Sequence, residues 1–265
     1  MSFLNLLMVS DRIDIYRTWQ IHTRLPRIRD TLDMAASRFV TVKNLGRMRY
    51  GPAIAKMKET CEQKVAYRKR VSCSEPMDII YIVEHPPVYT IGTRTQLYLG
   101  PSTTDFERTD EKLKKLGAEF YKTNRGGLIT FHGPGQLVCY PVLNLRNFKP
   151  SARWYINRLE QVVIDTCADF KINVGRTADI GVWTEDRKIA AIGVHVSKYI
   201  TSHGLALNCN TDLSWFDHIV PCGIQGKSVT SLSKELNTDI KIEDVVPILL
   251  KKFQNLFNCQ LIMSQ

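Results

Sequence analysis

The sequence predicts an α+β fold, a mixed or antiparallel sheet with flanking helices that pack mainly on one face. Three observations support this prediction. From residue 39 onward, runs of β-branched and aromatic residues alternate with segments whose apolar residues recur at helical spacing. Three strand-like runs follow one another late in the chain. With 265 residues, 44% of them hydrophobic, the chain is long enough to bury a substantial core.

The first half of this fold begins with a predicted strand at residues 39–42. Gly51 and Pro52 then begin a helix, because proline is well tolerated in a first helical turn. Residues 78–84 are a run of β-formers, which predicts a buried strand. His85-Pro86-Pro87 ends that strand, because proline has no N–H group to donate to a sheet.

The pattern continues with a short helix over residues 111–116 and a strand over residues 118–123. Ser151 is a predicted N-cap, because its hydroxyl can accept a hydrogen bond from the first turn of a helix whose apolar face extends to Phe170. A last amphipathic helix is predicted over Ile242–Phe257. Three successive antiparallel strands are predicted at residues 180–184, 188–196 and 200–207.

A glycine-rich stretch, residues 125–136, lies between two apolar, strand-like runs. Gly126 and Gly127 allow the backbone to pass where a side chain would collide with another strand or with a ligand. The Gly133-Pro134-Gly135 turn then reverses or kinks the chain. Two interpretations remain open from the local pattern: a glycine-rich hairpin with a bulge, and a ligand-binding segment.

This stretch resembles the signature of the lipoyl(octanoyl) transferases. The family signature is Arg-Gly-Gly, two variable residues, Thr, an aromatic residue, His and Gly-Pro-Gly-Gln, and every position is filled here. The resemblance extends from about residue 39 to about residue 235. Further segments that resemble the family in the same order are His85–Thr90, Arg187–Gly193, Ser202–Asn208 and Val220–Gly223.

The resemblance implies the fold shared by the catalytic domains of biotin and lipoate protein ligases. It also implies an acyltransferase that moves an octanoyl group from octanoyl-acyl carrier protein to a lysine of lipoyl domains, the first step of endogenous protein lipoylation. The acceptors would include the glycine cleavage H protein and the E2 subunits of 2-oxoacid dehydrogenases. Such an enzyme needs no cofactor and no metal, and a eukaryotic member would work in the mitochondrial matrix.

The resemblance assigns catalysis to Cys222 and Lys188, with the acyl group carried as a thioester on the cysteine. A free thiol has a pKa of about 8.5, so a nearby ammonium group would favour the reactive thiolate. Pro221 would rigidify the backbone on one side of Cys222, and Gly223 would leave the other side open, so that the sulfur is fixed but accessible. From the residues alone, the commoner interpretations are a small buried hydrophobe for Cys222 and a solvated residue at a strand end for Lys188. Only the resemblance reverses them.

The resemblance also places the substrate in three segments whose small residues leave space and whose larger apolar residues line a slot. An alternative is that the small residues serve only close strand packing. His132 and His203 lie in matching motifs, as positioning or purely structural residues. The predicted substrate-binding residues are Arg125, Gly126, Gly127, Leu128, Ile129, Thr130, Phe131, His132, Ala191, Ile192, Gly193, Gly204, Leu205 and Ala206.

Composition excludes several classes of protein. The formal net charge of +10 favours acidic partners, but the basic residues are scattered, which argues against nucleic acid. No apolar run approaches the roughly 18 residues that a membrane-spanning helix needs, so no membrane partner is predicted. The seven cysteines are odd in number and lack a Cys-x-x-Cys spacing, which indicates reduced thiols and no zinc site.

The first 38 residues are predicted to be a separate, weakly packed extension, followed by a catalytic domain over residues 39–265. The extension is rich in arginine, as in a mitochondrial presequence, but it also contains acidic residues, which such peptides lack. It is therefore either an imperfect presequence or an extension upstream of a start at Met34.

Three rival functions remain. A lipoate–protein ligase or a lipoyl amidotransferase would share the fold, but neither needs a cysteine at position 222. A biotin ligase would carry a longer arginine–glycine run than residues 125–127 provide. The last rival is a non-catalytic basic protein that binds acyl carrier protein or RNA.

Overall fold

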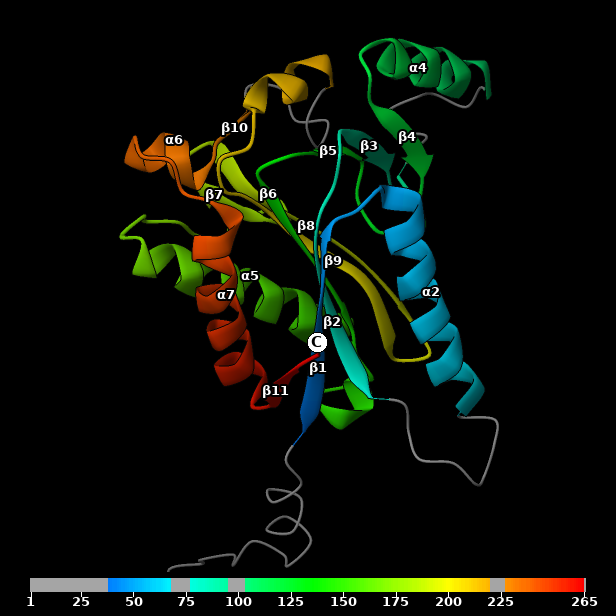
Figure 1. Ribbon diagram of the computed structural model, residues 1–265, viewed down its shortest axis with the longest axis vertical. Coiled ribbons are helices and arrows are strands. Elements are labelled where there is room, and N and C mark those ends of the chain that lie inside the picture. The colour runs from blue at the N-terminus through cyan, green and yellow to red at the C-terminus, as the bar shows by residue number, and fades with distance from the viewer. Residues whose placement is uncertain (1–37, 68–76, 95–102, 220–226, 265) are drawn as a thin grey trace, which may run out of the picture. The chain divides into compact units, whose positions relative to one another are not determined.

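The structure is a computed structural model that describes residues 38–67, 77–94, 103–219 and 227–264 (Figure 1). Five α-helices and two short 3-10 helices lie in these described residues. They are α2 (Tyr50–Tyr67), α4 (Thr103–Lys115), α5 (Ala152–Asp169), α6 (Leu232–Leu236), α7 (Ile242–Phe257), η1 (Leu145–Asn147) and η2 (Leu213–His218). None of the helices within the described ranges is long and apolar enough to cross a bilayer.

A mixed sheet of eight strands, counted over the described residues, forms the centre of the fold. Its order is β10-β8-β9-β6-β2-β1-β11, and β7 pairs with β8. The pairs β1·β2, β1·β11 and β8·β10 are parallel and the others antiparallel. The strands are β1 (Phe39–Arg47), β2 (Asp78–Glu84), β6 (Gln136–Val142), β7 (Val182–Thr184), β8 (Arg187–Ser197), β9 (Ile200–Asn208), β10 (Ser228–Val229) and β11 (Gln260–Met263).

These assignments confirm the mixed sheet and the antiparallel series β7, β8 and β9. The predicted N-cap of α5 is also confirmed, because the side chain of Ser151 accepts a hydrogen bond from the N–H of Trp154. The helix predicted over residues 111–116 is longer, since α4 begins at Thr103. The first turns of α4 contain few apolar residues, so apolar periodicity does not indicate them.

A second sheet of three strands was not predicted. Its order is β4-β3-β5, with β3 at Val88–Ile91, β4 at Glu119–Lys122 and β5 at Ile129–His132. The hairpin interpretation of the glycine-rich stretch is therefore wrong, because β5 pairs with β3 whereas β6 pairs with β2 and β9.

Two breaks in the chain explain the division into two sheets. His85-Pro86-Pro87 leads from β2 to β3, and Gly133-Pro134-Gly135 leads back from β5 to β6. At Gly135, φ is +76°, and an added Cβ would lie 2.6 Å from Oδ1 of Asn210. Only glycine fits this turn. The chain leaves the small sheet here and enters the large one as β6.

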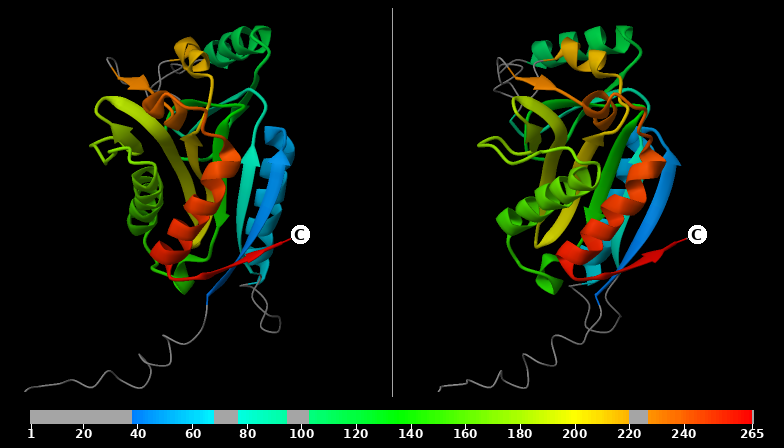
Figure 2. Two further views of the ribbon diagram at one scale, coloured as in Figure 1. Left: turned by 60° about the vertical axis from the view of Figure 1, so that its left-hand side comes forward. Right: turned by 90° about the vertical axis from the view of Figure 1, so that its left-hand side faces the viewer.

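Helices α5 and α7 cover one face of the large sheet, and α2 covers the other (Figures 1 and 2). Ile80 and Ile82 belong to the core cluster that includes α5 and α7, whereas Tyr81 and Val83 belong to the cluster that includes α2. Successive strand residues point to opposite faces, so β2 is buried on both sides. Helices were expected mainly on one face of the sheet. This is correct for α5 and α7, whereas α2 lies on the opposite face.

Candidate acyl-binding site

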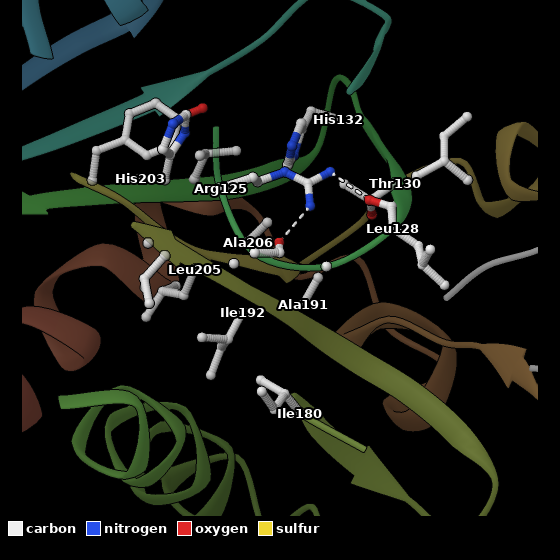
Figure 3. A pocket seen from close by; sticks show the side chains of 18 of the residues that line it. Arg125, Leu128, Thr130, His132, Ile180, Ala191, Ile192, His203, Leu205 and Ala206 are labelled. Atoms are coloured by element: carbon white, nitrogen blue, oxygen red, sulfur yellow. Dashed lines mark hydrogen bonds between the residues drawn. The ribbon is translucent and has the colours of Figure 1, made fainter. Parts of the chain in front are cut away.

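A cavity of about 120 Å³ lies where the loop before β5 meets β8 and β9. Figure 3 shows Arg125, His132 and His203 along one side of this cavity and Ile180 and Ile192 along the other. Residues predicted to bind substrate that line it are Arg125, Gly126, Gly127, Leu128, Ile129, Thr130, His132, Ala191, Ile192, Gly193, Gly204, Leu205 and Ala206. Lys188 lines it as well.

Phe131 was also predicted to bind substrate, but the structure places it elsewhere. Its ring is fully buried in the core of the small sheet and stacks on the ring of Trp215, with centroids 5.2 Å apart. Alternation along β5 explains the difference, because Thr130 and His132 point toward the cavity and their neighbour points away. Phe131 therefore supports the wall of the site from behind.

Arg125 holds the glycine-rich loop in shape. Its Nη2 donates to the carbonyl oxygen of Thr90 at 2.7 Å and to that of Leu128 at 3.0 Å, and Nη1 donates to the carbonyl oxygen of Gly126 at 3.0 Å. The Thr90 hydroxyl accepts a further hydrogen bond from Nη2 at 2.8 Å. The buried guanidinium thus fixes the cavity wall through backbone oxygens (Figure 3).

Glycines allow the loop to lie against β8. The N–H of Gly126 donates to the carbonyl oxygen of Val194 at 3.0 Å. A Cβ on Gly193 would lie 3.0 Å from Cδ of Arg125, and one on Gly204 would lie 2.1 Å from the carbonyl oxygen of Cys139. Close packing therefore explains Gly193 and Gly204 at least as well as space for a ligand does.

His132 belongs to a buried network of hydrogen bonds. Its Nδ1 lies 2.7 Å from Oε1 of Gln136, which can only accept, so Nδ1 carries the proton. Nε2 is then the acceptor for the hydroxyl of Thr90 at 3.4 Å. Gln136 donates onward to Asn208 at 2.8 Å, and Asn208 donates to the carbonyl oxygen of Thr230 at 2.8 Å. The network ends beside β10.

Three histidines near the cavity are neutral at pH 7. Burial, together with the nearby His85 and Arg125, lowers the pKa of His132 to about 3. Burial followed by the charge of Arg125 lowers the pKa of His203 to about 3, and burial lowers that of His85 to about 4. The polar side of the cavity therefore offers neutral imidazoles, opposite the apolar side chains of Ile180 and Ile192.

Lys188 lines the cavity, with 7% of its surface exposed. Its Nζ is 4.6 Å from the centre of the Trp183 ring. This placement contradicts the interpretation of Lys188 as a solvated residue at a strand end. Cys222 lies outside the described residues. The described chain resumes at Lys227, and β10 then runs parallel to β8, with Val229 in register with Lys188.

Sequence patterns missed several lining residues. They are Tyr50, Arg94, Val138, Tyr140, Ile156, Ile180 and Val194, and His203, whose role was left open. Tyr50 comes from α2 and Ile156 from α5. The local sequence pattern of a helix does not show that both helices contribute to the same cavity. Ile180 carried a usable signal in the sequence, since it is an apolar residue beside Gly181 in a polar segment. In the structure it is 49% exposed.

Comparison with known proteins identifies the family. The model described as the lipoyl protein ligase A/B catalytic domain matches residues 59–254. The chain belongs to this family. Members of the lipoyl protein ligase A/B family with similar sequences include the mitochondrial octanoyl-[acyl-carrier-protein]:protein N-octanoyltransferase of Danio rerio. That protein is 51% identical over 222 residues, with 84% of this chain and 94% of the relative covered.

A bacterial relative is similar over the same length. The octanoyltransferase of Solibacter usitatus is 41% identical over 222 residues, covering 83% of this chain and 94% of its own. These relatives confirm the resemblance to octanoyltransferases that the motifs indicated.

Solved structures confirm the fold of the lipoyl protein ligase A/B family. A lipoate-protein ligase A bound with ATP superposes with a TM-score of 0.60 at 14% identity, covering 86% of this chain and 90% of that one. A bipartite lipoate protein ligase from Thermoplasma acidophilum gives 0.59 at 13% identity, covering 86% of each chain. At these identities the likeness concerns the fold alone.

Proposed function

We propose that this protein transfers an octanoyl group from octanoyl-acyl carrier protein to a lysine of lipoyl domains, the first step of endogenous protein lipoylation. The observation that carries the proposal is the cavity itself, whose wall combines the predicted acyl-binding segments with the buried ammonium group of Lys188. The similarity to curated octanoyltransferases supports the same activity.

The size and lining of the cavity suit an acyl chain. One water needs about 10–15 Å³ of such space, so about 120 Å³ accommodates on the order of ten groups of that size. Ala191, Ile192 and Leu205 supply an apolar surface along β8 and β9. Each buried methylene contributes about 0.8 kcal/mol, so the depth of the slot can select the chain length.

In the first half-reaction, the thiolate of Cys222 attacks the thioester carbonyl of the donor. The new carbon–sulfur bond forms as the bond to the carrier thiol breaks. The ammonium group of Lys188 donates its proton to the departing thiolate. The products are an octanoyl-enzyme thioester, a free carrier thiol and a neutral Lys188 amine, with no change in oxidation state.

In the second half-reaction, the neutral ε-amine of the acceptor lysine attacks the enzyme thioester. The bond to Cys222 breaks, the amide forms, and Lys188 accepts the proton that the nitrogen loses. The thiolate and the ammonium group are thereby restored. Converting a thioester to an amide is downhill, so this sequence of steps requires no nucleotide.

The path of the chain after the cysteine motif supports a pairing of Cys222 with Lys188. Lys227 follows Cys222 closely in the sequence, and β10 follows directly. The N–H of Thr230 donates to the carbonyl oxygen of Lys188 at 2.9 Å. The segment after the cysteine motif thus joins the sheet beside the lysine.

The partners and location follow from the same proposal. The net charge of +10 favours acidic protein partners, as acyl carrier protein and lipoyl domains are in this pathway. Glycine cleavage H protein and the E2 subunits of 2-oxoacid dehydrogenases are the proposed acceptors. Relatives of this chain are named as mitochondrial, and we assign this protein to the matrix.

The proposed catalytic domain is residues 39–265, with residues 1–38 dispensable for chemistry. Deleting residues 1–33 is expected to leave the rate of octanoyl transfer unchanged in vitro. A folded but inactive truncated protein would contradict this division.

Mass spectrometry of the intact protein tests the function. After incubation with octanoyl-acyl carrier protein and no ATP, the wild type is expected to gain one octanoyl group and Cys222→Ser none. Cys61→Ser is the matched control, because burial raises the pKa of the Cys61 thiol to about 11, so it is expected to be acylated normally. Labelling that persists in Cys222→Ser would reassign the nucleophile, and labelling only with free octanoate and ATP would favour a ligase.

The role of Lys188 has its own test in the same assay. Lys188→Ala is expected to slow acylation about 10²–10⁴-fold, the usual contribution of a general acid. Lys251→Ala, on the exposed side of α7, is the control and is expected to react like the wild type. A normal rate in Lys188→Ala would remove its acid–base role.

A further inference from the structure

The indole ring of Trp183 contacts two ammonium groups. The Nζ atoms of Lys188 and Lys227 each lie 4.6 Å from the centre of this ring. Trp183 is only 3% exposed, and it pairs with Lys188 across the antiparallel strands β7 and β8. An ammonium group over an indole face is attracted by the negative potential of the ring, more strongly where water is excluded.

The ring itself is held in place from several directions. Its Nε1 donates to the carbonyl oxygen of Asp179 at 3.1 Å. The backbone of Trp183 exchanges hydrogen bonds with Gly175 at 2.7 and 2.9 Å. The carboxylate of Asp179 in turn lies 3.0 Å from Nζ of Lys227. Trp183 is therefore a fixed surface on which the flexible side chain of Lys188 rests.

Gly181 opens the space that the lysine side chain occupies. Its φ is +132°, and an added Cβ would lie 3.0 Å from Cε and 3.4 Å from Nζ of Lys188. The lysine side chain thus occupies the space beside Gly181 that a larger residue would fill, and it lies against the face of Trp183. The ring does not line the cavity, whereas Lys188 does.

We propose that Trp183 is a positioning residue, which holds the ammonium group of Lys188 at the wall of the acyl cavity through its indole face. The inference rests on the proposed function, because it assigns Trp183 a part in the proton transfer that Lys188 performs. Since the ring does not touch the acyl chain, its loss affects the rate of acylation and not the binding of the donor.

Single-turnover acylation by octanoyl-acyl carrier protein, without acceptor, tests the proposal. Trp183→Leu keeps a buried apolar side chain but removes the aromatic face, and its maximal acylation rate is expected to fall about tenfold, about 1.4 kcal/mol. The donor concentration for half-maximal rate is expected to stay within about twofold of wild type, because cavity contacts are unchanged. Trp183→Phe keeps an aromatic face and is expected to retain most of the rate.

Trp154→Leu is the matched control, because Arg158 lies over that ring, 5.7 Å from its centre, on α5 and outside the cavity. It is expected to react at the wild-type rate. Thermal melting of each variant shows whether it folds.

Equal losses in Trp183→Phe and Trp183→Leu, or a loss confined to donor binding, would assign Trp183 a purely structural role. A normal rate in folded Trp183→Leu would also overturn the inference. Failure of the proposed function looks different, because the wild type itself would then not be acylated.

Discussion

The ammonium group of Lys64 lies 2.7 Å from the carboxylate of Asp78, and both side chains are almost wholly buried, at 1% and 6% exposure. The pair joins the last turns of α2 to the first residue of β2. The carboxylate of Asp78 also accepts a hydrogen bond from the N–H of Asn144 at 2.8 Å. It therefore connects α2, β2 and the segment after β6. These contacts hold α2, which supplies Tyr50 to the cavity, against the sheet.

Removing one member of this pair is expected to be costly, because the other charge stays buried. Lys64→Met is expected to lower the free energy of unfolding by about 3–5 kcal/mol. The control is Lys114→Met in α4, whose side chain is mostly exposed in its pair with Asp110, and which is expected to cost about 1 kcal/mol or less. Urea denaturation measures both. Similar losses in the two variants would show that burial does not set the cost.

Stability is expected to fall as pH decreases from about 6.5 to 5. The pKa values of His85, His132 and His203 are lowered to about 3–4 in the folded protein, against about 6.5 in the unfolded chain. In this pH window the unfolded chain binds these protons and the folded protein does not, so acid favours unfolding.

The size of that effect is measurable. Three such groups give a slope of up to about 4 kcal/mol per pH unit once the unfolded histidines are protonated, which urea denaturation at several pH values can measure. His132→Gln is expected to reduce the slope by about a third, since one proton fewer is taken up on unfolding. A stability that does not change over this window would mean that the three histidines titrate normally in the folded state.

Gly204 is expected to tolerate no larger residue. Gly204→Ala would place a Cβ 2.1 Å from the carbonyl oxygen of Cys139, so β6 and β9 must separate, at a cost of about 1–3 kcal/mol. Gly175→Ala is the control, because nothing lies within 4 Å of an added Cβ there, and it is expected to change stability by less than about 1 kcal/mol. Thermal melting distinguishes them, and an unaffected Gly204→Ala would mean that the strands have room to move.

The sequence predicted the parts of the site that are local in the chain. Segments 125–132 (except Phe131), 191–193 and 204–206 line one cavity as the resemblance implied. Ala191 and Gly193 are in register with Ala206 and Gly204. The contributions of the helices were not predictable. Apolar spacing shows which face of a helix is buried, but it does not show which strand or loop that face meets.

The second sheet was missed for a related reason. The prolines after β2 and the glycines after β5 correctly predicted where strands end. The partner of a strand depends on segments far away in the sequence, and β3 pairs with both β4 and β5. The two sheets therefore follow from long-range pairing that turn chemistry does not specify.

The last prediction concerns chain-length selection. Ala191 lines the cavity on β8, opposite Ala206 on β9 (Figure 3). Ala191→Leu is expected to fill part of the slot, so that shorter acyl donors are preferred. Each methylene that no longer fits loses about 0.8 kcal/mol of binding, about fourfold in affinity. Acylation rates with hexanoyl- and octanoyl-acyl carrier protein measure the preference.

Ala55→Leu, on the exposed face of α2, is the matched control and is expected to keep the wild-type preference for octanoyl. Unchanged rates with both the octanoyl and the hexanoyl donor in folded Ala191→Leu would place the acyl chain outside this cavity. A lower rate with both donors at a constant ratio would mean that Ala191 lies near the thioester end of the chain. A shift toward hexanoyl in Ala191→Leu alone would place the far end of the acyl chain between β8 and β9.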